Sequence, residues 1–304
     1  MIQESFRNLI RAEGARLYRD LAWRRTRDPY EIWLSEVMLQ QTQVPRVEGR
    51  WPEWLERFPS VFALAEASTG EVLAAWQGMG YNRRALALKA AAEEVVRTYD
   101  GVFPSGVKEL VALPGIGPAT AQGIRSFAFD LPGVYLETNV RTVFLHHLFP
   151  EVPSVPDREL VPLVEAACPA GRAAGCADGY EGGGYAQPQD ADDTPRAWYY
   201  ALLDYGFYLK KTVPNPSRRS KAYTRQSKFE GSRRQKRAAV VRMLLDAQVA
   251  ARPELALDEV SVHLDDLERQ AGRPPVKRDE VHSILDDLVR EGFCCEQGGS
   301  WRIA

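Results

Sequence analysis

Hydrophobic residues recur along most of the chain at the three- and four-residue spacing of an α-helix. This pattern predicts helices over residues 3–21, 30–41, 85–99 and 198–209. Glycine and proline separate the helical stretches, and the longest of them are apolar enough to pack against one another. The predicted fold class is therefore all-α.

The segment from residue 229 to the end follows a different order. A helix is predicted from Ser232, two more over residues 257–267 and 278–291, and then a β-hairpin about Gly298 and Gly299. Three helices followed by a ribbon are typical of a winged helix-turn-helix. A small helical packing module is the alternative interpretation.

The stretch from Val107 to Val143 organises the first segment. Its centre is Leu113-Pro-Gly-Ile-Gly117, between two stretches of helical spacing. Gly115 and Gly117 can take positive φ and leave the backbone bare, while Pro118 and Thr120 suit the first turn of the second helix. Amides at such a helix N-terminus can hold a phosphate. A plain helical corner is the alternative.

An apolar run follows this predicted hairpin, from Val134 to Val140. It ends in Glu137 and Asn139 and then resumes helical spacing. A carboxylate at this junction can lie close to a sugar whose phosphate the hairpin holds.

A second acidic residue, Glu36, lies inside the very apolar helix predicted over residues 30–41. Such a carboxylate either faces solvent or is held where burial raises its pKa. The uncharged side chains of Gln40, Gln41, Thr42 and Gln43 follow it at the end of the helix. This combination favours base reading and proton donation over a solvated surface helix.

The turn Gly78-Met-Gly-Tyr-Asn-Arg-Arg84 places Met79, Tyr81 and Arg83 close to a glycine hinge. An ordinary turn is one interpretation. Bulky residues on a hinge can also wedge into a stack of bases.

Charge is unevenly distributed over the 304 residues, of which 45% are hydrophobic. The net charge is −2, but residues 206–242 carry twelve Lys and Arg against one Glu, so this segment holds +11 and the remainder −13. The basic residues are interleaved with Tyr223 and Phe229. Many basic runs are solvated faces, yet this one favours contact with a polyanion.

Several classes of protein are excluded by the composition. No stretch approaches 18 uninterrupted apolar residues, and the N-terminus lacks the pattern of a signal peptide, so we expect no membrane contact and a cytoplasmic, nucleoid-associated protein. The four cysteines show neither a disulfide framework nor metal-ligand spacing, so no metal site is expected. They are Cys168, Cys176, Cys294 and Cys295. Residues 169–195, rich in Gly, Ala, Asp and Pro, are predicted to be a mobile insertion.

Three motifs together resemble the helix-hairpin-helix DNA glycosylase superfamily, and within it the MutY-like adenine DNA glycosylases. They are Trp33-Leu-Ser-Glu-Val-Met-Leu-Gln-Gln-Thr-Gln43, Gly78-Met-Gly-Tyr81 and Leu113-Pro-Gly-Ile-Gly117. The resemblance covers roughly residues 20–210 in collinear order. It implies a two-lobed, all-helical glycosylase domain over residues 1–228, including the basic segment 206–228, with the winged-helix-like domain over residues 229–304.

The resemblance also implies roles for single residues. Glu36 matches the general acid, Glu137 the carboxylate beside the sugar, and Asn139 an asparagine near it. Residues expected to contact DNA come from the glutamine segment, the glycine turn, the hairpin and the basic segment. They are Gln40, Gln41, Thr42, Met79, Tyr81, Arg83, Gly115, Gly117, Thr120, Arg218, Arg219, Lys221 and Arg225.

The sequence departs from the family at three places, and a fourth position bears on strand cleavage. Glu137 stands where the family has Asp, one methylene shorter. Lys210 stands where the first cysteine of the family's iron–sulfur loop would be, and no cysteine follows as far as Arg237, so we expect no iron–sulfur cofactor. The C-terminal segment is too short for the Nudix-like domain of the family. Ala119 occupies the position of the Schiff-base lysine of the lyase branch, so strand cleavage is not expected.

The expected function is a monofunctional, monomeric DNA glycosylase of base excision repair that hydrolyses adenine mispaired with 8-oxoguanine or guanine in double-stranded DNA. Two alternatives stay open. One is a glycosylase of the same fold with a different target base, because Glu137 and the C-terminal segment both depart from the family. The other is a non-catalytic protein that binds DNA or DNA damage.

Overall fold

The computed structural model describes residues 4–171, 193–252 and 254–304. The chain forms two compact units, and each is assembled from two separate stretches of sequence. Unit 1 combines Met1–Gln40 with Phe103–Arg225, and unit 2 combines Gln41–Val102 with Gln226–Ala304. Within the described residues, no helix is both long and apolar enough to cross a membrane.

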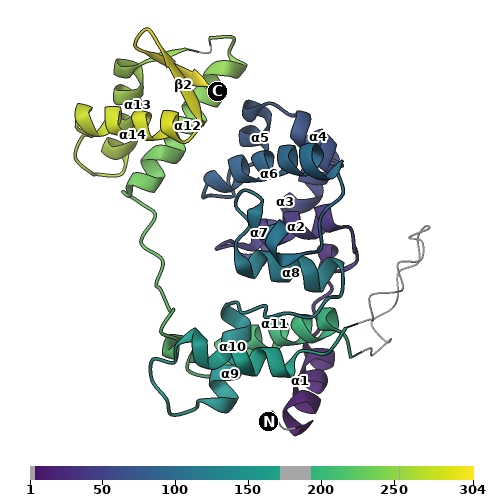
Figure 1. The fold of residues 1–304 in the computed structure, drawn as a ribbon. Coiled ribbons are helices and arrows are strands. Elements are labelled where there is room, and N and C mark those ends of the chain that lie inside the picture. Colours follow the sequence, from purple (N-terminus) through teal and green to yellow (C-terminus); the bar gives the residue numbers. More distant parts are fainter. Residues whose placement is uncertain (1–3, 172–192, 253) are drawn as a thin grey trace. The chain divides into compact units, whose positions relative to one another are not determined.

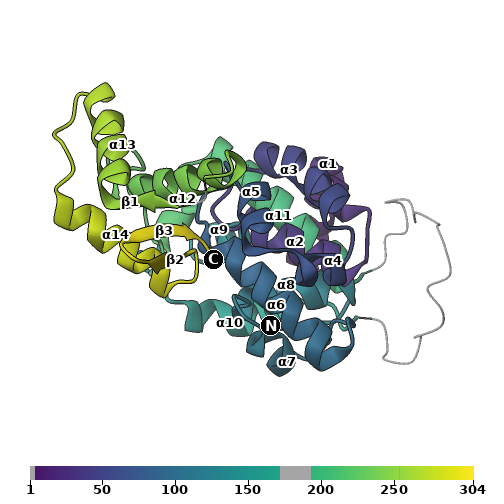
Figure 2. The same ribbon diagram turned by 90° about the horizontal axis from the view of Figure 1, so that it is seen from above.

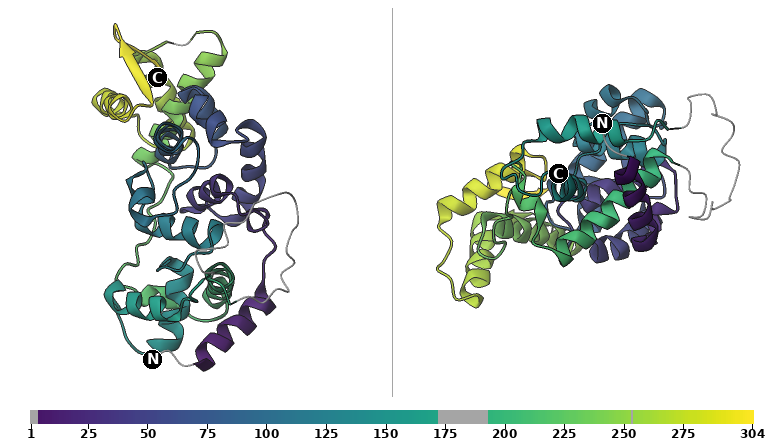
Figure 3. Two further views of the ribbon diagram at one scale, coloured as in Figure 1. Left: turned by 45° about the vertical axis from the view of Figure 1, so that its right-hand side comes forward. Right: turned by 90° about the horizontal axis from the view of Figure 1, so that it is seen from below.

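Unit 1 is built of helices (Figures 1 and 3). Its α-helices are α1 (Glu4–Leu17), α2 (Pro29–Leu39), α7 (Val107–Ala112), α8 (Pro118–Ala128), α9 (Thr138–Leu148), α10 (Asp157–Ala167) and α11 (Pro195–Thr212). Two short 3-10 helices, η1 (Ala22–Arg24) and η2 (Pro216–Arg219), complete it.

The core of unit 1 is aromatic and lies around α11, which packs along α1 and α9 (Figure 1). The rings of Phe127 and Tyr200 stack with centroids 4.4 Å apart. Close to this core, the carboxylate of Asp204 is buried and accepts hydrogen bonds from Arg24 and Arg19. A buried carboxylate is tolerated only with such partners, so the ion pair fixes α11 against the η1 region.

Helix α2 begins with two strong signals. The side chain of Asp28 caps it by accepting a hydrogen bond from the Tyr30 amide at 2.7 Å, and Pro29 occupies its first turn. Most of its residues are buried, and it packs against α8. The helix that carries Glu36 is therefore an interior element of unit 1.

Unit 2 contains two groups of elements. The first comprises α3 (Val44–Arg57), α4 (Val61–Glu66), α5 (Thr69–Ala75) and α6 (Arg83–Tyr99). The second comprises α12 (Arg233–Val249), β1 (Leu255–Ala256), α13 (Leu257–Gln270), α14 (Arg278–Arg290), β2 (Cys294–Gln297) and β3 (Ser300–Ile303). The core of the first group includes the buried rings of Trp54 and Trp76, whose centroids are 5.4 Å apart.

The second group has the element order of a winged helix. Its antiparallel sheet has the strand order β1-β3-β2, with Leu255 opposite Trp301 and Cys294 opposite Ile303. Figure 2 shows the strands beside α12 and α14. The predicted helices and hairpin are confirmed here, and the short β1 is an addition that the sequence pattern did not reveal.

Two other predictions concern segments rather than residues. Most of the insertion predicted at 169–195, including Cys176, lies outside the described residues. The predicted boundary between residues 228 and 229 lies between η2 and α12 and stays a prediction.

Candidate active site

Glu36 projects from α2 into a site formed within unit 1, where its side chain is half-buried. Burial of its carboxyl raises the pKa of Glu36 to about 8, and the charge of Glu137 adds to the rise. A hydrogen bond from the Tyr135 hydroxyl opposes it. Of the two alternatives for this acid, the structure has the one in which burial raises the pKa. The group is therefore protonated at neutral pH.

Space for this carboxyl comes from a glycine on the neighbouring helix. A Cβ atom at Gly123, in the middle of α8, would overlap the Oε2 atom of Glu36 and lie 3.0 Å from the ring of Tyr135. Glycine inside a helix costs about 1 kcal/mol relative to alanine. Here the missing side chain lets α8 lie close to the carboxyl of Glu36.

Glu137 is held by the N-terminus of α9. Its Oε1 atom accepts hydrogen bonds from the amides of Asn139 at 2.6 Å and Val140 at 3.1 Å. Burial raises the pKa of Glu137, whereas these two amides and the charges of Lys210 and Arg141 act to lower it. The helix end thus favours the ionised form of one acid, while Glu36 receives no such support from backbone amides.

Asn139 follows in the first turn of α9. Its Oδ1 atom is screened from solvent and has no hydrogen-bond partner among the described residues. Helix α11 approaches it closely, because a Cβ atom at Gly206 would overlap the carbonyl oxygen of Asn139. A buried acceptor without a partner is rare in folded proteins, so this oxygen is available to a bound molecule.

The predicted hairpin between α7 and α8 is present. Gly115 has a φ of +73°, a conformation open to both glycines, whereas Gly117 is extended with a φ of −83°. A Cβ atom at Gly117 would meet nothing within 4 Å. The backbone at the start of α8 is therefore open, with no side chain capping it.

Thr120 and Gln40, both predicted to contact DNA, contact each other in unit 1. The Gln40 amide donates a hydrogen bond to the Thr120 hydroxyl at 3.1 Å. Thr120 is buried in the first turn of α8, and this hydrogen bond links that turn to the end of α2.

The sequence profile described as "HhH-GPD superfamily base excision DNA repair protein" matches residues 34–180. This range contains both acids, Asn139 and the hairpin. This part of the chain resembles that superfamily.

Adenine DNA glycosylases are similar to part of this chain. That of Mycolicibacterium smegmatis is 46% identical over 126 residues, which cover 41% of this chain and 43% of the relative. That of Mycobacterium tuberculosis is 43% identical over 129 residues, which cover 42% of each protein. The chain thus matches about two fifths of the length of these relatives.

Two solved structures share the fold of much of this chain. A thermostable thymine-DNA glycosylase superposes with a TM-score of 0.53 and 22% identity, over 67% of this chain and 85% of that one. An endonuclease III bound to DNA superposes with a TM-score of 0.50 and 17% identity, over 70% and 87% of the two chains.

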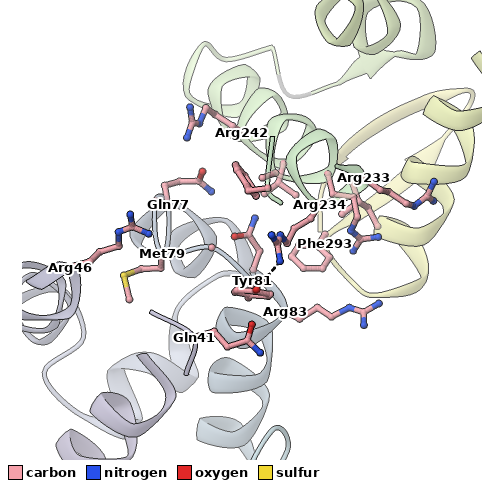
Figure 4. A pocket seen from close by; sticks show the side chains of 18 of the residues that line it. Gln41, Arg46, Gln77, Met79, Tyr81, Arg83, Arg233, Arg234, Arg242 and Phe293 are labelled. Atoms are coloured by element: carbon pink, nitrogen blue, oxygen red, sulfur yellow. Dashed lines mark hydrogen bonds between the residues drawn. The ribbon is translucent and has the colours of Figure 1, made fainter. Parts of the chain in front are cut away.

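Other residues that are predicted to contact DNA lie in unit 2, around the glycine turn (Figure 4). Tyr81 has a φ of +51°, and its hydroxyl accepts a hydrogen bond from Arg234 of α12 at 2.7 Å. Met79 is only 2% exposed, so insertion into DNA would require its side chain to move. Gln41 is exposed, and the Thr42 hydroxyl accepts a hydrogen bond from Arg84 at 3.1 Å.

Two of the basic residues that are predicted to contact DNA have side chains bonded to other parts of the protein. Arg83 pairs with Glu291, with Nε donating to Oε2 at 2.6 Å. Arg219 donates to the carbonyl oxygens of Pro150 at 2.7 Å and Leu145 at 2.8 Å. Arg218, Lys221 and Arg225 are exposed.

Sequence reasoning missed three residues of the site. Tyr135 lies within the apolar run from Val134 to Val140, but a phenol hydroxyl two residues before a predicted acid is a sequence feature that could have indicated a site residue. Gly123 and Lys210 carry no such signal, because their relation to Glu36 and Glu137 arises from the packing of α8 and α11.

Proposed function

We propose that the chain is a monofunctional DNA glycosylase that hydrolyses the bond between adenine and deoxyribose where adenine is mispaired with 8-oxoguanine or guanine. The observation that carries the proposal is the pair of acids in unit 1. Glu36 has a pKa of about 8, and Glu137 is held by two amides at the N-terminus of α9. Cleavage of a glycosidic bond uses one carboxyl as an acid and a second as a carboxylate, and we assign these roles to Glu36 and Glu137 respectively.

The first step in this mechanism is departure of the base. Protonated Glu36 gives its proton to a ring nitrogen of the adenine, the bond from C1′ to nitrogen breaks, and its electron pair leaves with the base. The sugar becomes an oxocarbenium-like cation. Oε2 of Glu137, which has no hydrogen bond to a described residue, is free to face that cation as a carboxylate oxygen.

The second step is addition of water. Glu36, now a carboxylate, takes a proton from a water molecule while the water oxygen bonds to C1′. The proton that Glu36 lost is thereby restored, and the products are free adenine and an abasic sugar. The unpartnered Oδ1 of Asn139 is a suitable acceptor for this water or for the sugar.

The adenine must leave the base stack before Glu36 can reach it. We propose that the open backbone at Gly115, Gly117 and the start of α8 holds a phosphate, and that Tyr81 and Gln41 contact the duplex. The double-stranded DNA partner is supported by the relatives and by the structural likeness to a DNA-bound endonuclease III. An enzyme that acts on chromosomal DNA must work where that DNA lies, so we also propose that the protein is cytoplasmic and associated with the nucleoid. We propose in addition that it acts as a monomer.

No iron–sulfur cluster is part of the proposal. The family's cluster needs four cysteine thiolates, and residues 210–237 contain none. Among the described residues, no group of three or more His, Cys, Asp and Glu is placed to hold a metal ion. We likewise propose that strand cleavage does not follow base removal, because Ala119 cannot form a Schiff base.

The test is release of free base from a panel of duplexes containing A:8-oxoguanine, A:G, hypoxanthine or G:T. Adenine release should be fastest from A:8-oxoguanine. Glu36→Gln should lower the single-turnover rate by about 10²- to 10⁴-fold, because a general acid contributes that much, and duplex binding should persist. Glu151→Gln, at an exposed acid in the same unit, is the matched control and should keep the wild-type rate.

Three outcomes would contradict the proposal in different ways. Turnover of another duplex in preference to both adenine mispairs would indicate a different target base. Tight binding without release from any duplex would indicate a non-catalytic protein. Full activity in Glu36→Gln would remove the assigned acid.

A further inference from the structure

Unit 2 contains a pocket that the proposed mechanism does not use. It has a volume of about 770 Å³ and lies between the Gly78–Arg83 turn, the start of α3 and helix α12 (Figure 4). Residues 78–83 and α12 are more than a hundred positions apart in the sequence. The C-terminal group of elements therefore supplies one wall of a cavity whose other wall holds Tyr81 and Gln41.

The charge of this pocket is positive. Six arginines line it and no Asp or Glu does. Three of the six are neutralised from outside the lining, because Arg83, Arg233 and Arg237 pair with Glu291 or Asp287. The three others are Arg46, Arg234 and Arg242, and none contacts a carboxylate among the described residues.

The three uncompensated arginines divide into two kinds. Arg234 is used inside the wall: its guanidinium lies 4.9 Å from the ring centroid of Tyr81 and 5.4 Å from that of Phe229. It also donates to the Tyr81 hydroxyl. Arg46 and Arg242 are exposed, and their side chains make no hydrogen bond or ion pair with a described residue.

Two guanidinium groups lie close to the ring of Tyr81. Arg234 is 4.9 Å and Arg84 is 5.5 Å from the ring centroid. These cation–π contacts hold Tyr81 in place in the wall of the pocket.

We infer that this pocket binds the sugar–phosphate backbone of DNA, with Arg46 and Arg242 holding phosphate and α12 contributing to the contact surface. The inference rests on the proposed function in taking DNA as the partner. Arginine forms paired hydrogen bonds with phosphate, and the side chains of Arg46 and Arg242 have no carboxylate partner among the described residues that would compete for them. The contacting face is that of α12, the first helix of the winged-helix group.

Salt dependence of binding tests the inference. Each phosphate contact contributes about −0.9 to the slope of log K against log salt concentration for duplex DNA. The double variant Arg46→Gln/Arg242→Gln should therefore reduce the magnitude of the slope by about 2, measured by fluorescence anisotropy on an undamaged duplex. Circular dichroism melting should show an unchanged fold, because both side chains are exposed.

The matched control removes the same charge from elsewhere in unit 2. Arg269→Gln/Arg278→Gln changes two exposed arginines that pair with Asp266 and Asp258 and do not line the pocket, and its slope should equal that of the wild type. An equal reduction in both double variants would mean that total charge alone matters, and would overturn the inference. So would a wild-type slope in Arg46→Gln/Arg242→Gln.

This result is independent of catalysis. An undamaged duplex contains no base to excise, so the slopes are measured whether or not the wild-type protein turns over any duplex of the panel. Absence of base release would defeat the proposed function, while the slopes would still decide whether the pocket contacts DNA.

Discussion

At the scale of single residues, the site depends on two glutamates whose surroundings separate their roles. Glu36 was predictable from sequence because it is an acid within a very apolar helix that ends in uncharged hydrogen-bonding side chains. Its hydrogen bond to Tyr135 and the space left by Gly123 were not, since both depend on elements that are more than 80 residues further along the chain. Glu137 was predicted as a carboxylate near the sugar, but its capping of α9 was not.

The pH dependence of base release should follow from these two groups. Glu36 acts as an acid, so activity is present while it is protonated and is lost as the pH rises through about 8. Glu137 acts as a carboxylate, so activity is lost as the pH falls through its pKa, which burial raises above the ordinary value. Single-turnover rates between pH 4.5 and 9.5 should give a bell-shaped profile. A rate still constant at pH 9.5 would contradict the role of Glu36 as the acid.

At the scale of elements, helical spacing predicted most of the α-helices, since each buries one apolar face. The helix predicted over residues 30–41 is α2, and the one predicted over 198–209 is α11. The two-residue strand β1 was missed because so short a run shows no alternation. The extended conformation of Gly117 was not predicted because glycine permits both signs of φ and only the packing of the hairpin selects one.

The close approach of α8 to α2 yields a prediction. Gly123→Ala should lower base release by at least about tenfold, equivalent to about 1.4 kcal/mol in the barrier, because the new methyl group would displace the Glu36 carboxyl. Gly49→Ala in α3, where a Cβ atom meets nothing within 4 Å, is the control and should leave the rate unchanged. Wild-type kinetics in Gly123→Ala would show that the acid tolerates displacement.

At the scale of the whole molecule, the sequence revealed the uneven charge but not the interleaving of the two units. Local sequence patterns treat neighbours in sequence as neighbours in space, whereas residues 41–102 pack with the C-terminal segment. Such grouping depends on contacts between distant residues, which leave no local periodicity. The basic segment was visible in the sequence, and in the structure its residues Arg218, Lys221 and Arg225 are exposed to solvent.

Replacing these three exposed residues by glutamine should weaken binding to matched and mismatched duplexes alike. If each contacts one phosphate, the salt slope should fall in magnitude by about 2.7, while the ratio of affinities for the two duplexes stays constant. Arg219→Gln should behave differently and lower the melting temperature, because its guanidinium binds the carbonyl oxygens of Leu145 and Pro150. A change in the affinity ratio would mean that the segment reads bases.

The attachment of Glu137 to the first amides of α9 means that one side chain has both an architectural and a chemical duty. Loss of a helix cap costs about 1 kcal/mol, so variants at this position would melt early as well as react slowly. A screen that scored only folded yield would classify the residue as scaffolding. Kinetics recorded well below the melting transition are needed to separate the two contributions.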